Sequence, residues 1–298
     1  MTVGLLTYAR VGETVGGVEK FVSSLGNWLS CRSCTPVIVS RGLQNPVRVI
    51  LPSVPTEGRV LEVQAREKYY PSPALIEIVY SFAWVFLTVS KILNLNKTYK
   101  FDILHAHDDE YSGAAAVIAS RLLRVPVVIH LHGLNIRTRY LKMLDNKSGS
   151  SLLSRLVLTF DFLLERHVIR RADAVVAVSD EVKRYHALAR NAIEKFVLIP
   201  CGIDPSEIVS SGTLRVQYRS QLGIDEDETT IGFVGRLSAE KNPATLLRAC
   251  SGLLSKPLPG LRCRLLLVGG GPLEGQLLQL AQALRIRDRV IFLGVRHD

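Results

Sequence analysis

The sequence has 298 residues, of which 47% are hydrophobic, and its 37 Lys and Arg against 27 Asp and Glu give a formal net charge of +10. This composition excludes a disordered chain, and 5 scattered cysteines exclude a secreted disulfide scaffold. Gly and Pro, at 22 and 13 residues, are near average usage, which excludes collagen-like and low-complexity sequences. At roughly 100–200 residues per domain, the length predicts two domains.

Short apolar runs alternate with segments of helical period along the first two thirds of the chain. Val18, Val22 and Leu25, for example, share one face of a helix that follows an apolar strand. Strands that alternate with helices predict parallel βαβ units and doubly wound sheets. The predicted strands are 3–8, 37–40, 47–51, 102–106, 127–131, 174–178 and 196–199, the predicted helices are 18–29, 74–95, 112–123 and 152–171, and residues 52–73 are expected to be irregular.

The longest uncharged apolar segment is Ile78–Ser90, which has 13 residues. Crossing a bilayer takes about 20, so we expect this segment not to span a membrane. A buried helix is the favoured interpretation, and a helix lying in a membrane interface beside Lys91, Lys97 and Lys100 is the alternative. The N-terminus leads directly into a strand without a preceding basic segment, which favours a cytoplasmic location over export by a signal peptide.

The character of the sequence changes at Pro200–Pro205 and at Ser210–Gly212. We interpret this segment as an interdomain hinge that divides the chain into residues 1–201 and 202–298. Two domains of this kind would face each other across a cleft. The second is expected to be incomplete, because a doubly wound sheet has about six strands. Its predicted strands are 231–234, 264–268 and 290–293, and its predicted helices are 244–254 and 273–284.

Three loops that follow strands and precede helices are candidate phosphate sites, because helix N-termini favour anions. In the first, Gly16 and Gly17 would let the backbone approach a phosphate, although an ordinary turn explains them equally well. In the second, Arg236 and Lys241 suit a diphosphate, since Arg grips phosphate oxygens in a bidentate manner and Lys supplies a point charge. A solvated loop is the alternative interpretation of this pair.

The third loop contains Gly269 and Gly271 and lacks the third glycine of the dinucleotide fingerprint. A nicotinamide-dependent oxidoreductase would need that fingerprint and an acidic ribose ligand, so it is the weaker alternative. A nucleic-acid partner is not expected either, because aromatic residues are only 7% of the chain and no basic-aromatic motif is present.

Two pairs of alternating histidines occur in predicted strands: His105 with His107, and His130 with His132. Each pair projects from one face of its strand, so the four could be proposed as a metal cluster. No cysteine or carboxylate is evidently placed to complete such a site, and we expect no metal. His132 lies at the carboxyl end of its strand and is better placed to face the cleft as a hydrogen-bond donor.

Seven segments carry short motifs: Gly16–Lys20, Phe101–His107, Val125–Gly133, Ala172–Ser179, Ile199–Asp204, Phe233–Lys241 and Leu267–Pro272. In this order they resemble the motifs of the retaining glycosyltransferases of family 4, and the resemblance covers essentially the whole chain. One departure is Cys201, which stands where the family usually has Asn.

The resemblance implies an α/β fold of GT-B type, with two Rossmann-like domains. It also implies transfer of a sugar from a nucleotide diphosphate sugar to a glycan or lipid-linked acceptor, with retained configuration and no metal cofactor. His132 matches the family's active-site histidine, which contacts the transferring sugar. The donor-binding positions implied are Gly16, Gly17, Arg236, Lys241, Gly269 and Gly271.

The family continues past the strand at 290–293 for about half a domain, which bears two glutamates that hold the donor. This sequence stops at Asp298. We therefore expect either a truncated chain with little or no activity of its own, or a chain completed by a separately encoded piece.

The basic charge divides unevenly, because residues 202–298 hold 12 Lys and Arg against 10 Asp and Glu, which leaves +8 on residues 1–201. The first domain is the acceptor side in the family, so peripheral contact with an anionic inner membrane face or a phosphorylated lipid is one hypothesis. A solvated basic surface explains the charge equally well. The basic patch proposed for this contact comprises Arg137, Arg139, Lys142 and Lys147.

Overall fold

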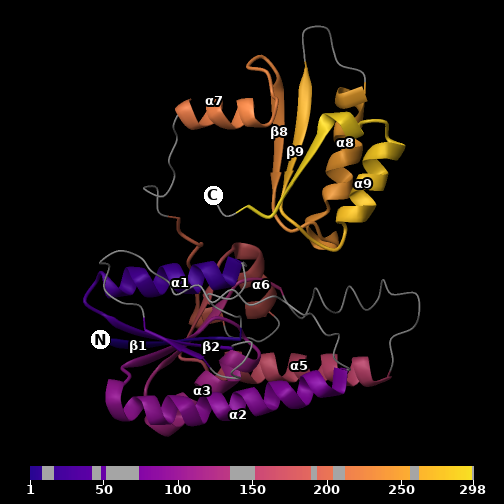
Figure 1. Ribbon diagram of the computed structural model, residues 1–298. Helices are drawn as coiled ribbons and strands as arrows, with labels where there is room; N and C mark the ends of the chain where they lie inside the picture. The colour runs from indigo at the N-terminus through magenta and orange to yellow at the C-terminus, as the bar shows by residue number, and fades with distance from the viewer. Residues whose placement is uncertain are drawn as a thin grey trace. The chain divides into compact units, whose positions relative to one another are not determined.

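The computed structural model describes residues 1–8, 17–41, 48–51, 74–134, 152–188, 193–203, 212–255 and 262–296. The chain divides into two compact units, Met1–Ile203 and Asp204–Asp298. The predicted boundary after residue 201 lies two residues before this division. Each unit contains its own sheet flanked by helices (Figure 1), and the predicted cleft between the two stays a prediction.

The described part of the first unit contains a seven-stranded sheet in the order β3-β2-β1-β4-β5-β6-β7. The strands are β1 Thr2–Thr7, β2 Thr35–Ser40, β3 Arg48–Ile50, β4 Ile103–Ala106, β5 Val127–Leu131, β6 Ala174–Ala177 and β7 Phe196–Leu198. All neighbours pair in parallel except β2 and β3. The prediction of parallel units is therefore wrong at β3, because the short connection 41–47 cannot make a crossover of a dozen or more residues.

Helices cover both faces of this sheet (Figure 1). They are α1 Gly17–Ser30, α2 Ala74–Tyr99, α3 Tyr111–Leu123, α5 Leu152–Arg171 and α6 Asp180–Leu188, with a 3-10 turn, η1, at Ile193–Lys195. On one face, Val22 of α1 packs in a core cluster with Leu5 and Ile38. On the opposite face, the larger core joins α2, α3 and α5 to Leu104 and Ile129.

The apolar helix α2 is buried on one side only. Trp84 and Ile92 are fully buried, whereas Phe86 keeps 76% of its surface exposed. The interpretation of this segment as a buried helix is thus right for one side and wrong for the other. No helix among the described residues is long and apolar enough to cross a membrane.

The described part of the second unit contains a three-stranded parallel sheet in the order β10-β9-β8. Its elements are α7 Gly212–Gln221, β8 Thr229–Val234, η3 Ala239–Lys241, α8 Pro243–Ser255, β9 Cys263–Val268, α9 Glu274–Ala283, η4 Arg287–Arg289 and β10 Val290–Gly294. Leu247, Leu265 and Leu277 form its core. Helix α7 was not predicted, because most of its described side chains are exposed and leave no clear apolar face.

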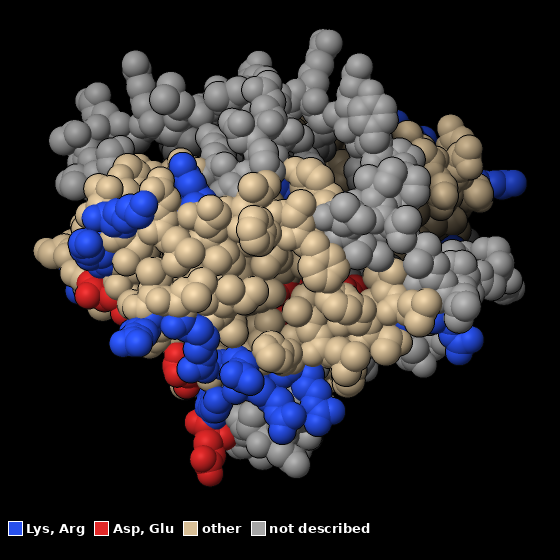
Figure 2. All heavy atoms as spheres, turned by 90° about the horizontal axis from the view of Figure 1, so that it is seen from below, with Lys and Arg blue, Asp and Glu red and all other residues tan. Residues whose placement is uncertain are grey.

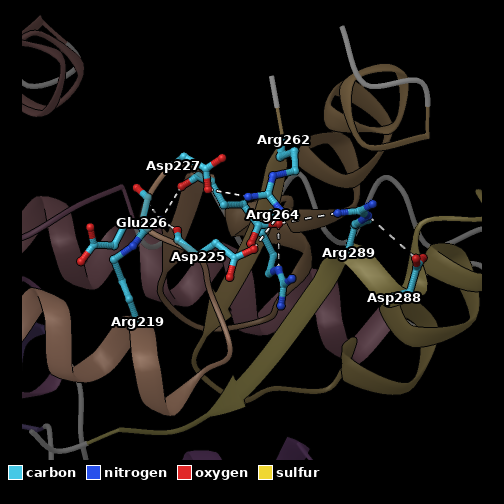
Figure 3. A network of polar contacts seen from close by, with 9 residues as sticks. Arg219, Asp225, Glu226, Asp227, Arg262, Arg264, Asp288 and Arg289 are labelled. Carbon is cyan, nitrogen blue, oxygen red and sulfur yellow. Dashed lines mark hydrogen bonds and ion pairs between the residues drawn. The ribbon is translucent and has the colours of Figure 1, made fainter. Parts of the chain in front are cut away.

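A polar network stabilises the second unit at the amino ends of its strands (Figure 3). Glu228, which is 3% exposed, accepts a hydrogen bond from Arg264 Nε at 3.1 Å and lies 3.6 Å from Arg289 Nη1. Arg219 donates hydrogen bonds to the backbone carbonyls of Asp225 and Glu228. These contacts lie at the opposite end of the sheet from the loops that follow β8 and β9, so their role is structural.

We expect Glu228→Gln to lower the free energy of unfolding by about 2–4 kcal/mol, because a neutral amide leaves two guanidinium groups without their counter-charge. Arg262→Ala is the matched control. It removes an exposed pairing with Asp225 and Asp227, for which we expect about 0–1 kcal/mol. Urea unfolding followed by circular dichroism measures both, and equal losses would contradict the assignment of the buried network as the stabilising one.

Candidate functional site

The two predicted histidine pairs lie side by side at the carboxyl ends of β4 and β5. Phe21 of α1 packs against three of the rings, with centroid distances of 5.7 Å to His107, 5.0 Å to His130 and 4.9 Å to His132. The rings of His105 and His107 stack at 4.4 Å, as do those of His130 and His132. The four imidazoles therefore form one layer beneath α1, which we call the histidine layer.

A hydrogen bond joins the two halves of the histidine layer. His107 Nδ1 lies 3.2 Å from His132 Nε2, so one ring donates its N–H to the other. His107 is 1% exposed, whereas His132 is only partly buried. A buried ring on β4 thus orients a more accessible ring that follows β5.

Burial keeps the histidine layer uncharged. It lowers the pKa of His132 to about 4, and together with the neighbouring imidazoles it lowers the pKa of His105 to about 4 and of His130 to about 3. The same causes hold the pKa of His107 well below its usual value. At neutral pH each ring can therefore donate one hydrogen bond and accept one.

Two groups among the described residues have metal-ligand chemistry, and the first lies in the histidine layer. His105, His107 and His130 each offer a nitrogen within 4.8 Å of the others. Their rings stack with interplanar angles of 30°, 11° and 28°. His132 is not a member of this group, and the expectation of no metal stays a prediction.

The second group consists of Asp109, Glu165 and His186, all buried. His186 Nδ1 lies 2.5 Å from Glu165 Oε1 and 3.9 Å from Asp109 Oδ2. Burial is the main cause that raises the pKa of Asp109 well above its usual value, and the nearby charge of Glu165 is the second cause. This cluster connects the segment after β4 to α5 and α6. Sequence reasoning missed it because its members are far apart in the chain.

Asp108 follows the first histidine pair and has a structural role. Its carboxylate accepts hydrogen bonds from the N–H groups of Glu110 and Ser112 at 3.1 Å. It also accepts one from the N–H of Tyr8 at 3.3 Å. These contacts cap the first turn of α3 and attach it to the end of β1.

Sequence reasoning also missed a basic residue at the carboxyl end of β2. The guanidinium of Arg41 lies 4.8 Å from the ring centre of Tyr8 and 4.7 Å from that of Tyr80. Tyr8 in turn packs edge-on against Trp84 at 5.0 Å. The only sequence signal was a cation directly after a strand, at the edge of the sheet where ligands bind in this fold class.

In the second unit, the loops after β8 and β9 are joined through their backbones. The N–H of Leu237 donates to the carbonyl of Gly270 at 2.9 Å, and the N–H of Leu273 donates back to the carbonyl of Leu237 at 3.1 Å. Leu237 is fully buried. The two loops therefore form a single support directly before α8 and α9, which we call the paired loops.

The paired loops present the two predicted cations. Arg236 and Lys241 are exposed, and neither side chain makes a hydrogen bond or an ion pair within the part of the chain that the structure describes. Lys241 ends η3, and α8 begins two residues later. Both charges are thus available for an anion near a helix N-terminus.

The two loops approach each other so closely that positions 269 and 271 require glycine. A Cβ at Gly269 would lie 2.0 Å from the carbonyl oxygen of Gly235, and one at Gly271 would lie 2.5 Å from that of Leu237. Gly269 also has φ +133°, which other residues rarely adopt. These glycines shape the support for Arg236 and Lys241.

The first predicted glycine loop is only partly described. Gly16 lies outside the described residues. Gly17 is the exposed first residue of α1, and a Cβ there would meet nothing within 4 Å. No described contact therefore requires glycine at position 17, and the donor-binding role of both positions stays a prediction.

The fold matches that of solved GT-B glycosyltransferases. HepE of Anabaena, solved in complex with UDP-glucose, aligns with a TM-score of 0.63 at 19% identity, over 99% of this chain and 69% of that chain. WaaG, a glycosyltransferase involved in lipopolysaccharide biosynthesis, aligns with a TM-score of 0.64 at 16% identity, over 99% and 70%. The predicted fold class is thus confirmed.

Residues 15–207 match the family described as Glycosyltransferase Family 4, and residues 215–298 match Glycosyl transferases group 1. The chain therefore belongs to glycosyltransferase family 4. It is 28% identical to alpha-D-kanosaminyltransferase of Streptomyces kanamyceticus, over 89% of this chain and 69% of that protein. It is 29% identical to alpha-monoglucosyldiacylglycerol synthase of Streptococcus pneumoniae, over 69% of this chain and 45% of that protein. Several such matches cover about half of the relative's length.

We expect Gly269→Ala to lower the free energy of unfolding by about 2 kcal/mol or more, because its Cβ collides with the backbone of Gly235 and its φ is strained. Gly275→Ala is the matched control. Gly275 is exposed on α9 with open space around it, and alanine there gains up to about 1 kcal/mol of helix propensity. Urea unfolding measures the free energy of unfolding of both variants. A Gly269→Ala variant as stable as wild type would contradict the close packing of the paired loops.

The histidine layer makes stability depend on pH. The unfolded chain binds protons below about pH 6.5 that the folded layer does not bind until about pH 4. The free energy of unfolding therefore falls as the pH drops through this window, by up to about 1.4 kcal/mol per pH unit for each histidine. We expect His130→Asn to reduce this slope.

Urea unfolding measured at intervals between pH 4 and pH 7 gives the slope for wild type and variant. Identical slopes for wild type and His130→Asn would show that the layer takes up protons in the folded state as readily as in the unfolded chain.

Proposed function

We propose that the chain is the catalytic part of a retaining glycosyltransferase that uses a nucleotide diphosphate sugar as donor. The observation that carries this proposal is the pair of exposed cations, Arg236 and Lys241, that the paired loops hold next to the N-terminus of α8. Family membership supports the reaction class, and the UDP-glucose complex of HepE is a structural neighbour with this kind of donor.

The two cations suit the departure of a nucleoside diphosphate. When the bond between the anomeric carbon and the diphosphate oxygen breaks, negative charge develops on the leaving group. Arg236 would hold phosphate oxygens through two parallel N–H groups, and Lys241 would add a compact charge. The N-terminal end of α8 adds a further partial positive charge through the helix dipole.

His132 would act on the sugar rather than on the diphosphate. A neutral imidazole can hydrogen-bond a sugar hydroxyl without competing for the anion, and the bond to His107 holds its ring in place. In the transfer, the acceptor oxygen bonds to the anomeric carbon, the bond from that carbon to the diphosphate oxygen breaks, and the acceptor proton passes to the departing diphosphate. We assign no protein nucleophile and no metal cofactor to this step.

A glycan or a lipid-linked molecule is the proposed acceptor. The name of the relative alpha-monoglucosyldiacylglycerol synthase supports a lipid acceptor. The proposed location is cytoplasmic, with peripheral contact at the inner membrane face as a further hypothesis. The alternative of a nicotinamide-dependent oxidoreductase is not favoured by the family matches.

We expect Arg236→Ala and Lys241→Ala each to weaken the binding of the matching nucleoside diphosphate by about tenfold or more, because each removes a charge-assisted contact. Arg248→Ala is the matched control, since this Arg is exposed farther along α8 and should leave the Kd unchanged. Isothermal titration with UDP, GDP and ADP, and then with their sugars, measures the effect.

Two results would contradict the proposal. If none of these nucleotides or nucleotide sugars binds the chain, the donor assignment is wrong. If Arg248→Ala weakens binding as much as the two loop variants, the effect reflects overall charge and not the paired loops.

A further inference from the structure

The helices α2, α3 and α5 present a continuous apolar surface on the side facing away from the sheet. The residues that define this surface, the apolar face, are Phe82, Phe86, Leu122, Leu156, Phe160 and Leu163. They keep between 36% and 76% of their surface exposed. The rings of Phe82 and Phe160 lie 5.2 Å apart, which joins α2 to α5. Figure 2 shows this side of the unit as a broad area that is mainly uncharged.

The exposed charges described on these three helices themselves are all positive. Among the described side chains of these three helices, the two acidic ones, Asp161 and Glu165, are buried. Figure 2 shows Lys and Arg side chains gathered along the border of the uncharged area. The exposed charged side chains of the helices are Lys91, Lys97, Arg121, Arg155, Arg166, Arg170 and Arg171.

This combination fits one kind of partner better than others. An exposed apolar patch of such extent marks an interaction surface. A two-fold contact with a second copy would bring two mainly cationic borders together, at a cost in electrostatic repulsion. Anionic lipid headgroups instead attract each cation, and Lys and Arg can lay their aliphatic stems along the apolar surface while their charges reach the headgroups.

We propose that the apolar face docks the first unit onto an anionic lipid bilayer. Phe82, Phe86 and Phe160 enter the boundary between headgroups and acyl chains, and the surrounding cations bind lipid phosphates. This goes beyond the donor chemistry of the paired loops. It also differs from the basic patch predicted at Arg137–Lys147, which lies outside the described residues.

The test is co-sedimentation of the whole chain with phosphatidylcholine vesicles that either contain or lack phosphatidylglycerol. We expect binding to the anionic vesicles at low salt and release near 1 M salt, where the Debye length falls to about 3 Å. Phe86→Glu and the double variant Lys91→Glu, Lys97→Glu should each lower the binding constant by about tenfold or more.

Matched controls lie on the other side of the sheet, where Trp28 of α1 is 55% exposed and Arg32 follows in the next turn. Trp28→Glu and Arg32→Glu remove an exposed aromatic ring and an exposed charge of the same kinds, and they should bind vesicles like wild type. Circular dichroism checks that all variants are folded, and nucleotide titration, performed separately, keeps a failure of docking distinct from a failure of the proposed function.

Three outcomes would overturn the proposal. The first is no binding to anionic vesicles at low salt. The second is an equal loss in the control variants, which would mean that net charge alone attracts the chain. The third is a dimer that Phe86→Glu converts to a monomer without any vesicle binding, which would make the apolar face a contact between two copies.

Discussion

The parallel register of β4 and β5 is the constraint on which the first unit's candidate site depends. Leu104 pairs with Val127 and Ala106 with Ile129, so the odd-numbered residues of β4 face the same side of the sheet as the even-numbered residues of β5. His105, His107, His130 and His132 therefore share the side covered by α1, while the apolar residues between them build the core on the side of α3. A shift of one residue in either strand would turn that strand's two imidazoles into the apolar core.

The same constraint operates in the second unit, where β8 and β9 pair from Thr229 with Cys263 to Val234 with Val268. Both strands end at the same level, so the loops that follow them meet. Their approach is so close that Gly269 and Gly271 face backbone oxygens with no room for a Cβ. The sequence indicated these two glycines as phosphate-binding residues. In the structure they allow close packing against the loop that bears Arg236 and Lys241.

Helix α2 illustrates why composition alone left two interpretations open. Its uncharged stretch is apolar nearly all round, so no amphipathic period distinguishes a buried helix from an interfacial one. In the fold, Trp84 and Ile92 pack against the sheet, while Phe86 remains exposed beside α3 and α5. The buried interpretation therefore describes one side of the helix, whereas the interfacial interpretation stays a prediction for the exposed side.

The sequence by itself determined the elements whose signal is local. The strand at 127–131 and the helix at 112–123 are within one residue of their predicted bounds, because β-branched runs and helical apolar spacing act over a few residues. It missed α6, although Ser179 Oγ accepts the N–H of Val182 as a cap, and it missed α7, whose exposed side chains carry little periodicity. Only the tertiary structure decided the bond between His107 and His132, the cluster of Asp109 with Glu165 and His186, and the antiparallel pairing of β3. Each joins parts of the chain through the order, direction and register of strands, and these depend on the packing of the whole sheet, which no local pattern encodes.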